Sequence, residues 1–306
     1  MINGRGVLMK KTTTGFLKIG LFLLTFSATT LLMTTQAFCR DLDEIKQQGV
    51  LKHLGVPYAN FVTGSGDGMD VEIVQLFAKY LGVRYEYVKT TWENVVPDLI
   101  GRKLKVDGNN VELLDAVPAR GDIVANGFTV LPWREKVLNF SSPTFPTQIV
   151  LVAPAKSTIR PIKPSGNINK DIGRVKKLTK NKTSLGVQNT CLDPALYNLK
   201  EEGAKIINFT GALSDLPSAV IKGESDTAIM EMPDALLALK KYPGKIKIIG
   251  PLSPTQEMAA GFAKDSVQLR NEFKIFLSQI KKDGTYLKIV KKYYPSAPEF
   301  YPAFFK

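Results

Sequence analysis

A single arginine that follows a short apolar segment has the clearest chemical potential in this chain. Residues 128–131 form a strand-like run, and Pro132 ends it because proline cannot donate a hydrogen bond to a sheet ladder. Arg134 then lies in a short connection at the end of a strand, where α/β proteins place groups that contact ligands. Its guanidinium can hold a carboxylate with two parallel hydrogen bonds. The competing interpretation of the same residues is a surface arginine beside a turn.

The elements that would position Arg134 alternate between strands and helices. Periodicity and turn residues predict strands at 50–56, 84–88, 123–130, 148–153, 183–187, 205–209, 226–230 and 245–249. The same signals predict helices at 41–46, 71–81, 92–100, 193–202, 213–222 and 233–239, with two more in 265–294 that break at Asp283-Gly284. This alternation favours an α/β protein with parallel-rich sheets covered by helices.

The N-terminal segment has the pattern of a signal peptide. Basic residues precede an apolar run at 19–33, and the first acidic residue is Asp41. Small residues suit cleavage after Ala37, so we expect residues 1–37 to be a signal peptide that is removed on export to the periplasm. The alternative is an uncleaved membrane anchor, for which the run is short. Met9, followed by two lysines, is a more usual start for such a segment than Met1.

The two cysteines and the single histidine limit the chemistry further. An exported protein meets oxidising conditions, and one disulfide between Cys39 and Cys191 is left open by the sequence. Phe38 stands where a lipidation motif requires a small residue, which disfavours a lipid anchor on Cys39. With His53 as the one histidine there is no familiar zinc ligand set, and we expect neither a metal nor a cofactor.

Length and charge narrow the function classes. The 306 residues are too many for one small core, which predicts two lobes or domains. The formal net charge is +13, and removal of residues 1–37 leaves 37 basic and 28 acidic residues, a net charge of +9. The lysines form scattered pairs without interleaved aromatic residues, so we expect a solvated basic surface and no nucleic-acid partner. The excess positive charge favours an anionic ligand.

Three sequence blocks carry a resemblance to a known family. Residues 68–73 (GMDVEI) resemble the motif G-F-D-V-D-L at a helix start, and residues 282–289 (KDGTYLKI) resemble a terminal D-G-T-Y-x-K-I motif. Residues 121–141 resemble a G-D-I block that continues to G-x-T, the arginine and F-S. In this order, the blocks resemble the bacterial extracellular solute-binding proteins of the polar amino-acid type, family 3, over about residues 42–295.

The resemblance implies a fold and a role. The fold class is α/β, the two-lobed type II periplasmic-binding-protein fold, with two mixed sheets flanked by helices and joined by a two-strand hinge. One lobe would be 42–147 plus 253–306, and the other 148–252; hinge motion would close them on the ligand. The implied role is the capture of a small carboxylate-bearing solute, an amino acid or a related compound, for an inner-membrane ABC permease. We expect a monomer without catalytic residues.

The resemblance also implies the ligand-binding residues of the first lobe. Arg134 occupies the place of the arginine that binds the ligand carboxylate. Gly127 and Thr129 match the positions seven and five residues before it, which give backbone and hydroxyl contacts. Tyr58 resembles the aromatic residue of the loop that covers the ligand.

In the second lobe, Thr190 would donate to the same carboxylate, and Glu231 falls where the family has an aspartate that binds the α-amine. Asp234 is an alternative partner for the amine. Asn189 stands where glycine is usual, and 103–118 is an insertion. These departures keep carboxylate recognition and leave the identity of the other end of the ligand open.

Two other functions stay open. A periplasmic enzyme like cyclohexadienyl dehydratase would need an acid or base in the cleft, and Glu231 is the candidate. A lytic transglycosylase would need a further catalytic domain, which we do not expect because about a dozen residues follow the last predicted helix. A ligand sensor for a membrane receptor is not separable from a transport protein by sequence.

Overall fold

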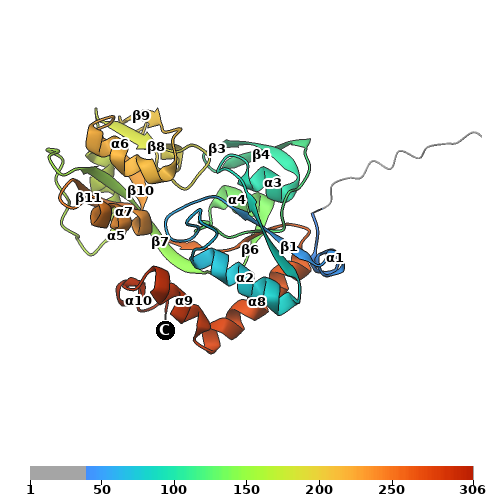
Figure 1. Cartoon of the computed structure of the whole chain (residues 1–306). Coiled ribbons are helices and arrows are strands. Elements are labelled where there is room, and N and C mark those ends of the chain that lie inside the picture. Colours follow the sequence, from blue (N-terminus) through green and yellow to red (C-terminus); the bar gives the residue numbers. More distant parts are fainter. Residues whose placement is uncertain (1–38, 306) are drawn as a thin grey trace, which may run out of the picture. The chain divides into compact units, whose positions relative to one another are not determined.

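The computed structural model describes residues 39–305 (Figure 1). The predicted signal peptide and the choice of start codon lie outside the described residues. Within 39–305, no helix is both long enough and apolar enough to cross a lipid bilayer.

The first of two five-stranded sheets has the strand order β2-β1-β5-β12-β6. Its strands are β1 (Val50–Gly55), β2 (Arg84–Lys89), β5 (Ile123–Val124), β6 (Leu138–Phe140) and β12 (Gly261–Ala263). β1 pairs in parallel with β2 and β5, whereas β12 is antiparallel to β5 and β6. The helices that contact this sheet, or one another beside it, are α1 (Leu42–Gln48), α2 (Met69–Leu81), α3 (Val95–Ile100), α4 (Pro132–Val137), α8 (Val267–Lys282) and α9 (Thr285–Tyr293). α10 (Ala297–Phe300) follows α9.

The second sheet has the order β11-β7-β10-β8-β9. Its strands are β7 (Phe145–Pro154), β8 (Thr183–Gly186), β9 (Lys205–Asn208), β10 (Thr227–Glu231) and β11 (Ile246–Met258). β8 is parallel to β9 and β10, and β7 is antiparallel to β10 and β11. It is contacted by α5 (Ile168–Lys177), α6 (Leu216–Lys222) and α7 (Met232–Lys241). Both sheets are therefore mixed and flanked by helices, as the family resemblance implies, and not as rich in parallel pairs as the alternation of elements suggests.

Two long antiparallel strands, β7 and β11, join the two sheets. Their pairing runs from Ile246 opposite Pro154 to Met258 opposite Phe145, and Met258 also forms a bridge with Thr129 beside the first sheet. The register shifts between Pro251 and Thr255. In this interval Ser253 makes the hydrogen bonds to β7. Its hydroxyl accepts from the amide of Ile149 at 3.0 Å, and its carbonyl accepts from the side chain of Gln148 at 3.0 Å. The fold is the two-lobed type II arrangement with a two-strand connection.

The structure corrects the strand predicted at 123–130. β5 stops at Val124 because Gly127 adopts the left-handed region, with φ of +64°, and the chain turns there. The run 128–131 contributes one isolated bridge and is not a strand. Pro132 begins helix α4, where its fixed φ is favourable and its missing N–H is not needed. Arg134 consequently lies in the first turn of a helix and not in a loop after a strand.

Other predicted elements also differ. The helix predicted at 193–202 is the 3₁₀ turn η1 (Pro194–Tyr197), which is capped by the carboxylate of Asp193 and ended by Asn198 in the left-handed region. The helix predicted at 213–222 divides into η2 (Leu213–Asp215) and α6. The sequence did not predict α5, and the insertion at 103–118 contains the hairpin of β3 (Arg102–Asp107) and β4 (Asn110–Ala116).

The helix boundaries that had clear capping signals are confirmed. Asp41 and Glu44 form a capping box at the start of α1, and Gly82 ends α2 in the left-handed region. α8 and α9 break at Asp283 and Gly284, as predicted.

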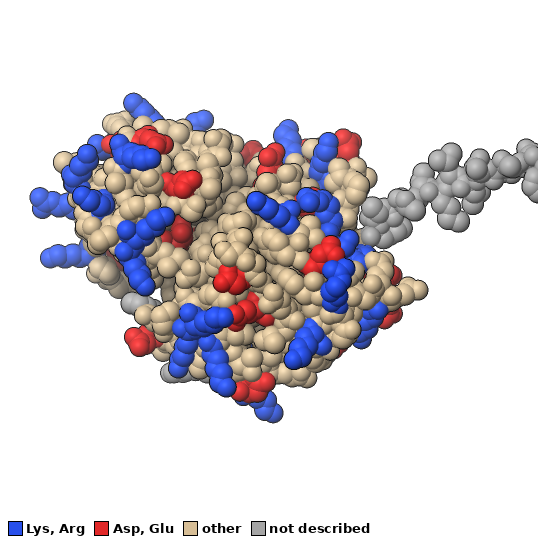
Figure 2. Space-filling model, viewed as in Figure 1, with Lys and Arg blue, Asp and Glu red and all other residues tan. Residues whose placement is uncertain are grey.

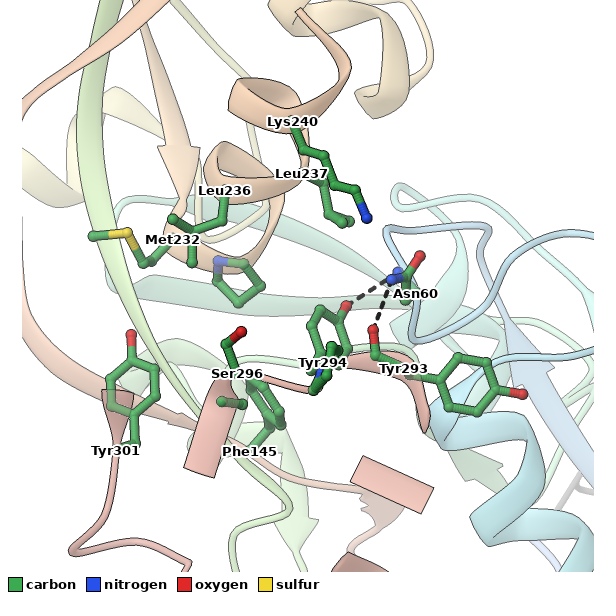
Figure 3. Close-up of a pocket in the computed structure, with 13 residues that line it drawn as sticks. Asn60, Phe145, Met232, Leu236, Leu237, Lys240, Tyr293, Tyr294, Ser296 and Tyr301 are labelled. Carbon is green, nitrogen blue, oxygen red and sulfur yellow. Dashed lines mark hydrogen bonds between the residues drawn. The ribbon is translucent and has the colours of Figure 1, made fainter. Parts of the chain in front are cut away.

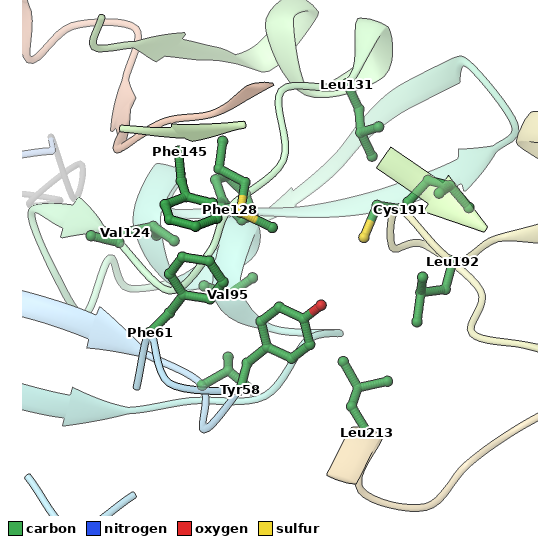
Figure 4. Close-up of a cluster of buried hydrophobic side chains, with 14 of the residues drawn as sticks. Tyr58, Phe61, Val95, Val124, Phe128, Leu131, Phe145, Cys191, Leu192 and Leu213 are labelled. Atoms are coloured by element: carbon green, nitrogen blue, oxygen red, sulfur yellow. The ribbon is translucent and has the colours of Figure 1, made fainter. Parts of the chain in front are cut away.

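Aromatic side chains from distant segments pack at the centre of the buried apolar cluster (Figure 4). Phe61, after β1, lies edge-on to Phe145 of β7 with ring centroids 5.2 Å apart. Tyr294, just after α9, lies 4.9 Å from both rings. These contacts hold the C-terminal helices against the start of the connecting strand β7.

Basic side chains are spread over the face that Figure 2 shows, with acidic side chains between them. This distribution agrees with the scattered lysine pairs in the sequence.

Candidate functional site

A buried carboxylate at the end of β10 gathers hydroxyl groups from distant segments. Glu231 is the last residue of β10 and the N-cap of α7, and 1% of it is exposed. Its Oε2 accepts a hydrogen bond from the hydroxyl of Tyr58 at 2.6 Å. Its Oε1 accepts from Thr129 at 2.5 Å and, more weakly, from Thr147 at 3.5 Å. We call these four residues the Glu231 network.

The electrostatics of the network follow from burial. Burial raises the pKa of Glu231, and the hydrogen bonds from Thr129 and Tyr58 act in the opposite direction because they favour the charged carboxylate. Burial, and then the charge of Glu231, raise the pKa of Tyr58 well above its usual value. Tyr58 therefore remains a neutral donor in the physiological range of pH.

Arg134 is a buried cation next to this network. Its guanidinium lies 3.9 Å from the centre of the Phe128 ring, and its Nη1 donates to the backbone carbonyl of Thr129 at 2.8 Å. Burial lowers the pKa of Arg134 to about 10, which still leaves it protonated at neutral pH. Its Nε is buried without a hydrogen-bond partner, and none of the ion pairs among residues 39–305 includes Arg134.

A second buried polar side chain, in the segment that leads to Arg134, also lacks hydrogen-bond partners. Asn126 is fully buried, and neither its Nδ2 nor its Oδ1 has a partner among the described residues. Buried amide groups are normally satisfied, and an unpaired one is unfavourable by roughly 1–3 kcal/mol. The segment 126–134 thus holds several donors that a polar ligand could satisfy.

The loop after β8 carries the predicted Thr190. The hydroxyl of Thr190 donates to the carbonyl of Val187 at 2.7 Å and accepts from the amide of Leu192 at 3.0 Å, so both bonds lie within the loop. Asn189 has a φ of +61°, the left-handed conformation that glycine would adopt without strain and that asparagine tolerates. The contact of Thr190 with a ligand stays a prediction.

Cys191 is a residue of this region that sequence reasoning considered only for a disulfide. Cys39 and Cys191 are both free thiols, so the structure contains no bridge between them. Cys191 is buried, and burial followed by the charge of Glu231 raises the pKa of its thiol well above the usual value. Figure 4 shows Cys191 on the same side of the cluster as the hydroxyl of Tyr58. Cys191 directly follows Thr190 in the sequence, and this neighbourhood could have suggested that Cys191 lies near the site.

Gly127 shapes the turn before Arg134. Its amide donates to Asp70 Oδ2 at 2.7 Å, so this N–H is already used within the protein. A Cβ at Gly127 would come within 2.5 Å of Phe61 Cδ2, in addition to the strain of its φ of +64°. The contact of Gly127 with a ligand also stays a prediction.

Replacing Gly127 by alanine should therefore destabilise the fold by about 2–4 kcal/mol, because backbone strain and overpacking add. Gly82→Ala is the matched control, because Gly82 has a φ of +73° and a Cβ added there would meet nothing within 4 Å. The control should lose only about 1 kcal/mol. Urea unfolding of both variants measures the difference in the free energy of unfolding. Equal losses of stability would show that Phe61 moves to make room for the added methyl group.

Two further residues frame the site. Asp234 is largely buried, and burial followed by Glu231 raises its pKa to about 7. Trp92 meets Tyr58 edge-on with ring centroids 5.6 Å apart. His53 lies apart from them: its ring nitrogens contact the hydroxyl of Tyr85 and the carbonyl of Ala125, and burial lowers its pKa to about 4. Among residues 39–305, no group of three or more His, Cys, Asp or Glu residues could hold a metal ion.

The structure thus brings together four of the six predicted residues. Tyr58, Thr129 and Glu231 share hydrogen bonds, and Arg134 joins them through the carbonyl of Thr129. A guanidinium and a carboxylate side by side can bind a solute that carries a negative and a positive group.

The chain is similar in sequence and in fold to several known proteins. The chain matches curated relatives that include membrane-bound lytic murein transglycosylase F of Desulfosudis oleivorans, which is 23% identical over 76% of this chain. The match covers 45% of that relative, so the chain spans less than half of its length. An octopine-binding periplasmic protein of Rhizobium meliloti is 22% identical over 69% of this chain and 71% of its own length.

A solved structure of a mutant of ArgBP from T. maritima is similar in fold. It superposes with a TM-score of 0.66 at 22% identity, over 83% of this chain and 99% of that one. The family model named bacterial extracellular solute-binding proteins, family 3, matches residues 109–296, which include α4, β10 and the C-terminal helix pair. The chain therefore belongs to the bacterial extracellular solute-binding proteins, family 3.

Proposed function

We propose that this protein binds a small solute that carries a carboxylate, and that Arg134 holds this carboxylate. The observation that carries the proposal is the buried guanidinium of Arg134, whose Nε has no partner and which forms no ion pair with another described residue. The charge of Glu231 favours the protonated guanidinium, but no described residue pairs with it directly, and a ligand carboxylate would supply that direct partner. The buried amide of Asn126, eight residues before Arg134 in the sequence, likewise has no hydrogen-bond partner among the described residues.

Glu231 would bind the other end of the solute. An ammonium group could replace the hydroxyl donors of Tyr58 and Thr129, and its positive charge would favour the ionised carboxylate. An amino acid or a related compound has both groups. The relatives named for octopine binding and as ArgBP support a ligand of this chemical type.

The lobes that we propose are 42–147 plus 253–306 and 148–252. Tyr58 and Thr129 then belong to one lobe and Glu231 to the other, so the Glu231 network joins them. We further propose that the protein works in the periplasm as a monomer and delivers its solute to an inner-membrane ABC permease. Presentation of the bound form to a membrane receptor is the alternative role.

Identification of a bound solute tests this function. The protein is purified under mild conditions from its own organism, denatured, and its released small molecules are analysed by mass spectrometry. We expect one carboxylate-bearing compound. Protein that has been freed of this compound by unfolding, and then refolded, should bind it again with 1:1 stoichiometry in calorimetry. A bound compound without an anionic group would contradict the proposal.

The role of Glu231 can be tested with a near-isosteric change. Glu231→Gln should weaken binding of an amine-bearing solute by about 10- to 100-fold, because a neutral amide cannot pair with an ammonium group. Glu272→Gln is the matched control, since Glu272 is partly exposed on α8 and its side chain bonds to Tyr80. Unchanged affinity of Glu231→Gln in calorimetry would show that Glu231 does not contact the charged end of the solute.

A dehydratase activity is a second candidate, favoured by the raised pKa of Glu231. A buried carboxyl group of this kind can give a proton to a leaving hydroxyl group. Incubation with prephenate or arogenate would show a product that Glu231→Gln does not form. If the wild-type protein gives no turnover, this candidate fails and solute binding is unaffected.

A further inference from the structure

A second cavity lies outside the Glu231 network, between α7 and the chain that links α9 to α10 (Figure 3). Its volume is about 320 Å³, at the lower end of the range for small-molecule sites. Phe145 and Asn60 line it as well. Figure 3 shows Asn60 beside Tyr294, and Phe145 on the side of the cavity away from α7. None of the six predicted ligand-binding residues lines this cavity.

One wall of the cavity is an apolar stripe that ends in a cation. Met232, Leu236 and Lys240 are spaced at intervals of four residues and therefore lie on one face of α7. Leu236 is 39% exposed, so its side chain is open to a ligand in the cavity. Lys240 is exposed, and none of the ion pairs among residues 39–305 includes it.

The opposite wall adds hydroxyl groups to an apolar surface. Tyr301 lines the cavity, and Figure 3 shows its hydroxyl directed toward Met232. Ser296 adds a second hydroxyl group. The hydroxyl of Tyr294 is already used, because it accepts a hydrogen bond from the amide of Asn60 at 3.0 Å.

We propose that this cavity is a second binding site, for a small organic anion with a short alkyl or aromatic body. The body would cover Leu236 and Met232, and the anionic group would pair with Lys240. Charge complementarity selects this class: a neutral apolar molecule leaves Lys240 unpaired, and an organic cation is repelled by it.

Two residues that line the cavity are adjacent to the Glu231 network or connect to it through packed rings. Met232 directly follows Glu231, and on the other side Tyr294 contacts Phe61, whose ring stacks on Tyr58 with centroids 6.0 Å apart. Tyr58 in turn donates a hydrogen bond to Glu231, so the two sides of the cavity are connected through Tyr58 and Glu231. A ligand in the cavity would therefore stabilise Tyr58 and Glu231 in the positions in which they are hydrogen-bonded. This coupling rests on the proposed function, whereas the second site itself does not.

Methionine-methyl NMR with hexanoate as the probe tests the site. Hexanoate should shift the signal of Met232 in a saturable manner and leave that of Met69, which is buried in α2, unchanged. Hexanol should bind about three- to fivefold more weakly, because it cannot pair with Lys240. Hexylammonium should bind more weakly still. If hexylammonium shifts Met232 as strongly as hexanoate does, the assignment of an anion site is wrong.

Two variants make the test specific. Leu236→Trp should fill the cavity and remove the saturable shift. Lys240→Gln, an exposed position that should leave the fold intact, should reduce hexanoate binding to the level of hexanol. Lys274→Gln on α8 is the matched control and should bind as the wild type does. A wild-type response from Lys240→Gln would overturn the role of the cation.

The coupling has its own readout. Saturating hexanoate should tighten binding of the cleft solute by at least twofold in the wild type and leave it unchanged in Leu236→Trp. Arg134→Met, which should not bind the solute, should still show the hexanoate shift at Met232. If hexanoate shifts the Met232 signal but leaves the solute affinity of the wild type unchanged, the two sites are not coupled. If the shift is lost in Arg134→Met, the second site is not independent of the cleft.

Discussion

Replacement of Arg134 by methionine is expected to weaken binding of the solute by about 100-fold or more. The variant keeps an unbranched apolar side chain over Phe128 and removes the one guanidinium of the site. Loss of a buried partner of a carboxylate reduces affinity by roughly 2–5 kcal/mol, which corresponds to a factor of about 30 to several thousand. Calorimetry with the co-purified solute measures the change.

The same variant separates a binding role from a structural one. The guanidinium has an unpaired Nε and one backbone hydrogen bond, so its removal should leave the free energy of unfolding of the ligand-free protein unchanged or raise it. Arg84→Met, at an exposed position in β2, is the control and should bind normally. A loss of several kcal/mol of stability together with normal affinity would mean that Arg134 serves the fold.

Replacement of Asp70 by asparagine is expected to abolish part of the pH dependence of stability. Burial raises the pKa of Asp70 to about 7 from 3.8, so between these values the folded state binds more protons than the unfolded state. The free energy of unfolding therefore falls as pH rises through this window, by up to about 1.4 kcal/mol per pH unit. Above pH 7 the variant should be more stable than the wild type by about 4 kcal/mol.

The asparagine should keep the local structure, because its carbonyl oxygen can still accept from the amide of Gly127. His53 acts in the opposite direction between about pH 4 and its unfolded value, since its pKa is lowered, and the difference between wild type and variant removes this contribution. Asp43→Asn, on the exposed side of α1, should follow the wild-type profile. Urea titrations from pH 4 to pH 8 measure the free energy of unfolding of the wild type, Asp70→Asn and Asp43→Asn. If the pH profile of Asp70→Asn is parallel to that of the wild type, the raised pKa of Asp70 is refuted.

The fold was predictable from local signals wherever those signals were sufficient. The capping box of Asp41 and Glu44, the terminal Gly82 and the break at Gly284 define helix ends through nearby residues, and all three are confirmed. The strand predicted at 123–130 failed because its end depends on Gly127, whose conformation is held by Asp70, 57 residues earlier. A period-two pattern cannot contain that distant contact.

The candidate site was predictable in part for the same reason. The family resemblance pointed to Arg134 and Glu231 as candidates, but their surroundings come from packing: Thr147 lies on β7, and Cys191 in the loop after β8. Neither residue is marked by its own sequence neighbourhood as a polar partner of Glu231. The apolar cavity beside α7 is likewise formed by segments that are about 60 residues apart, and no single segment predicts it.

The register shift between β7 and β11 determines where the connection between the sheets is compliant. Pro251 and Pro254 lack the N–H groups that would continue the ladder, and two hydrogen bonds to Ser253 stand in their place. Each such bond contributes only about 1 kcal/mol, close to the thermal energy, whereas the paired stretches on either side are held by many bonds at once. A second register shift lies between Ile248 and Gly250, so we expect the connection between the sheets to bend in this part of the β7–β11 ladder and the paired stretch that contains Thr147 to move as a unit.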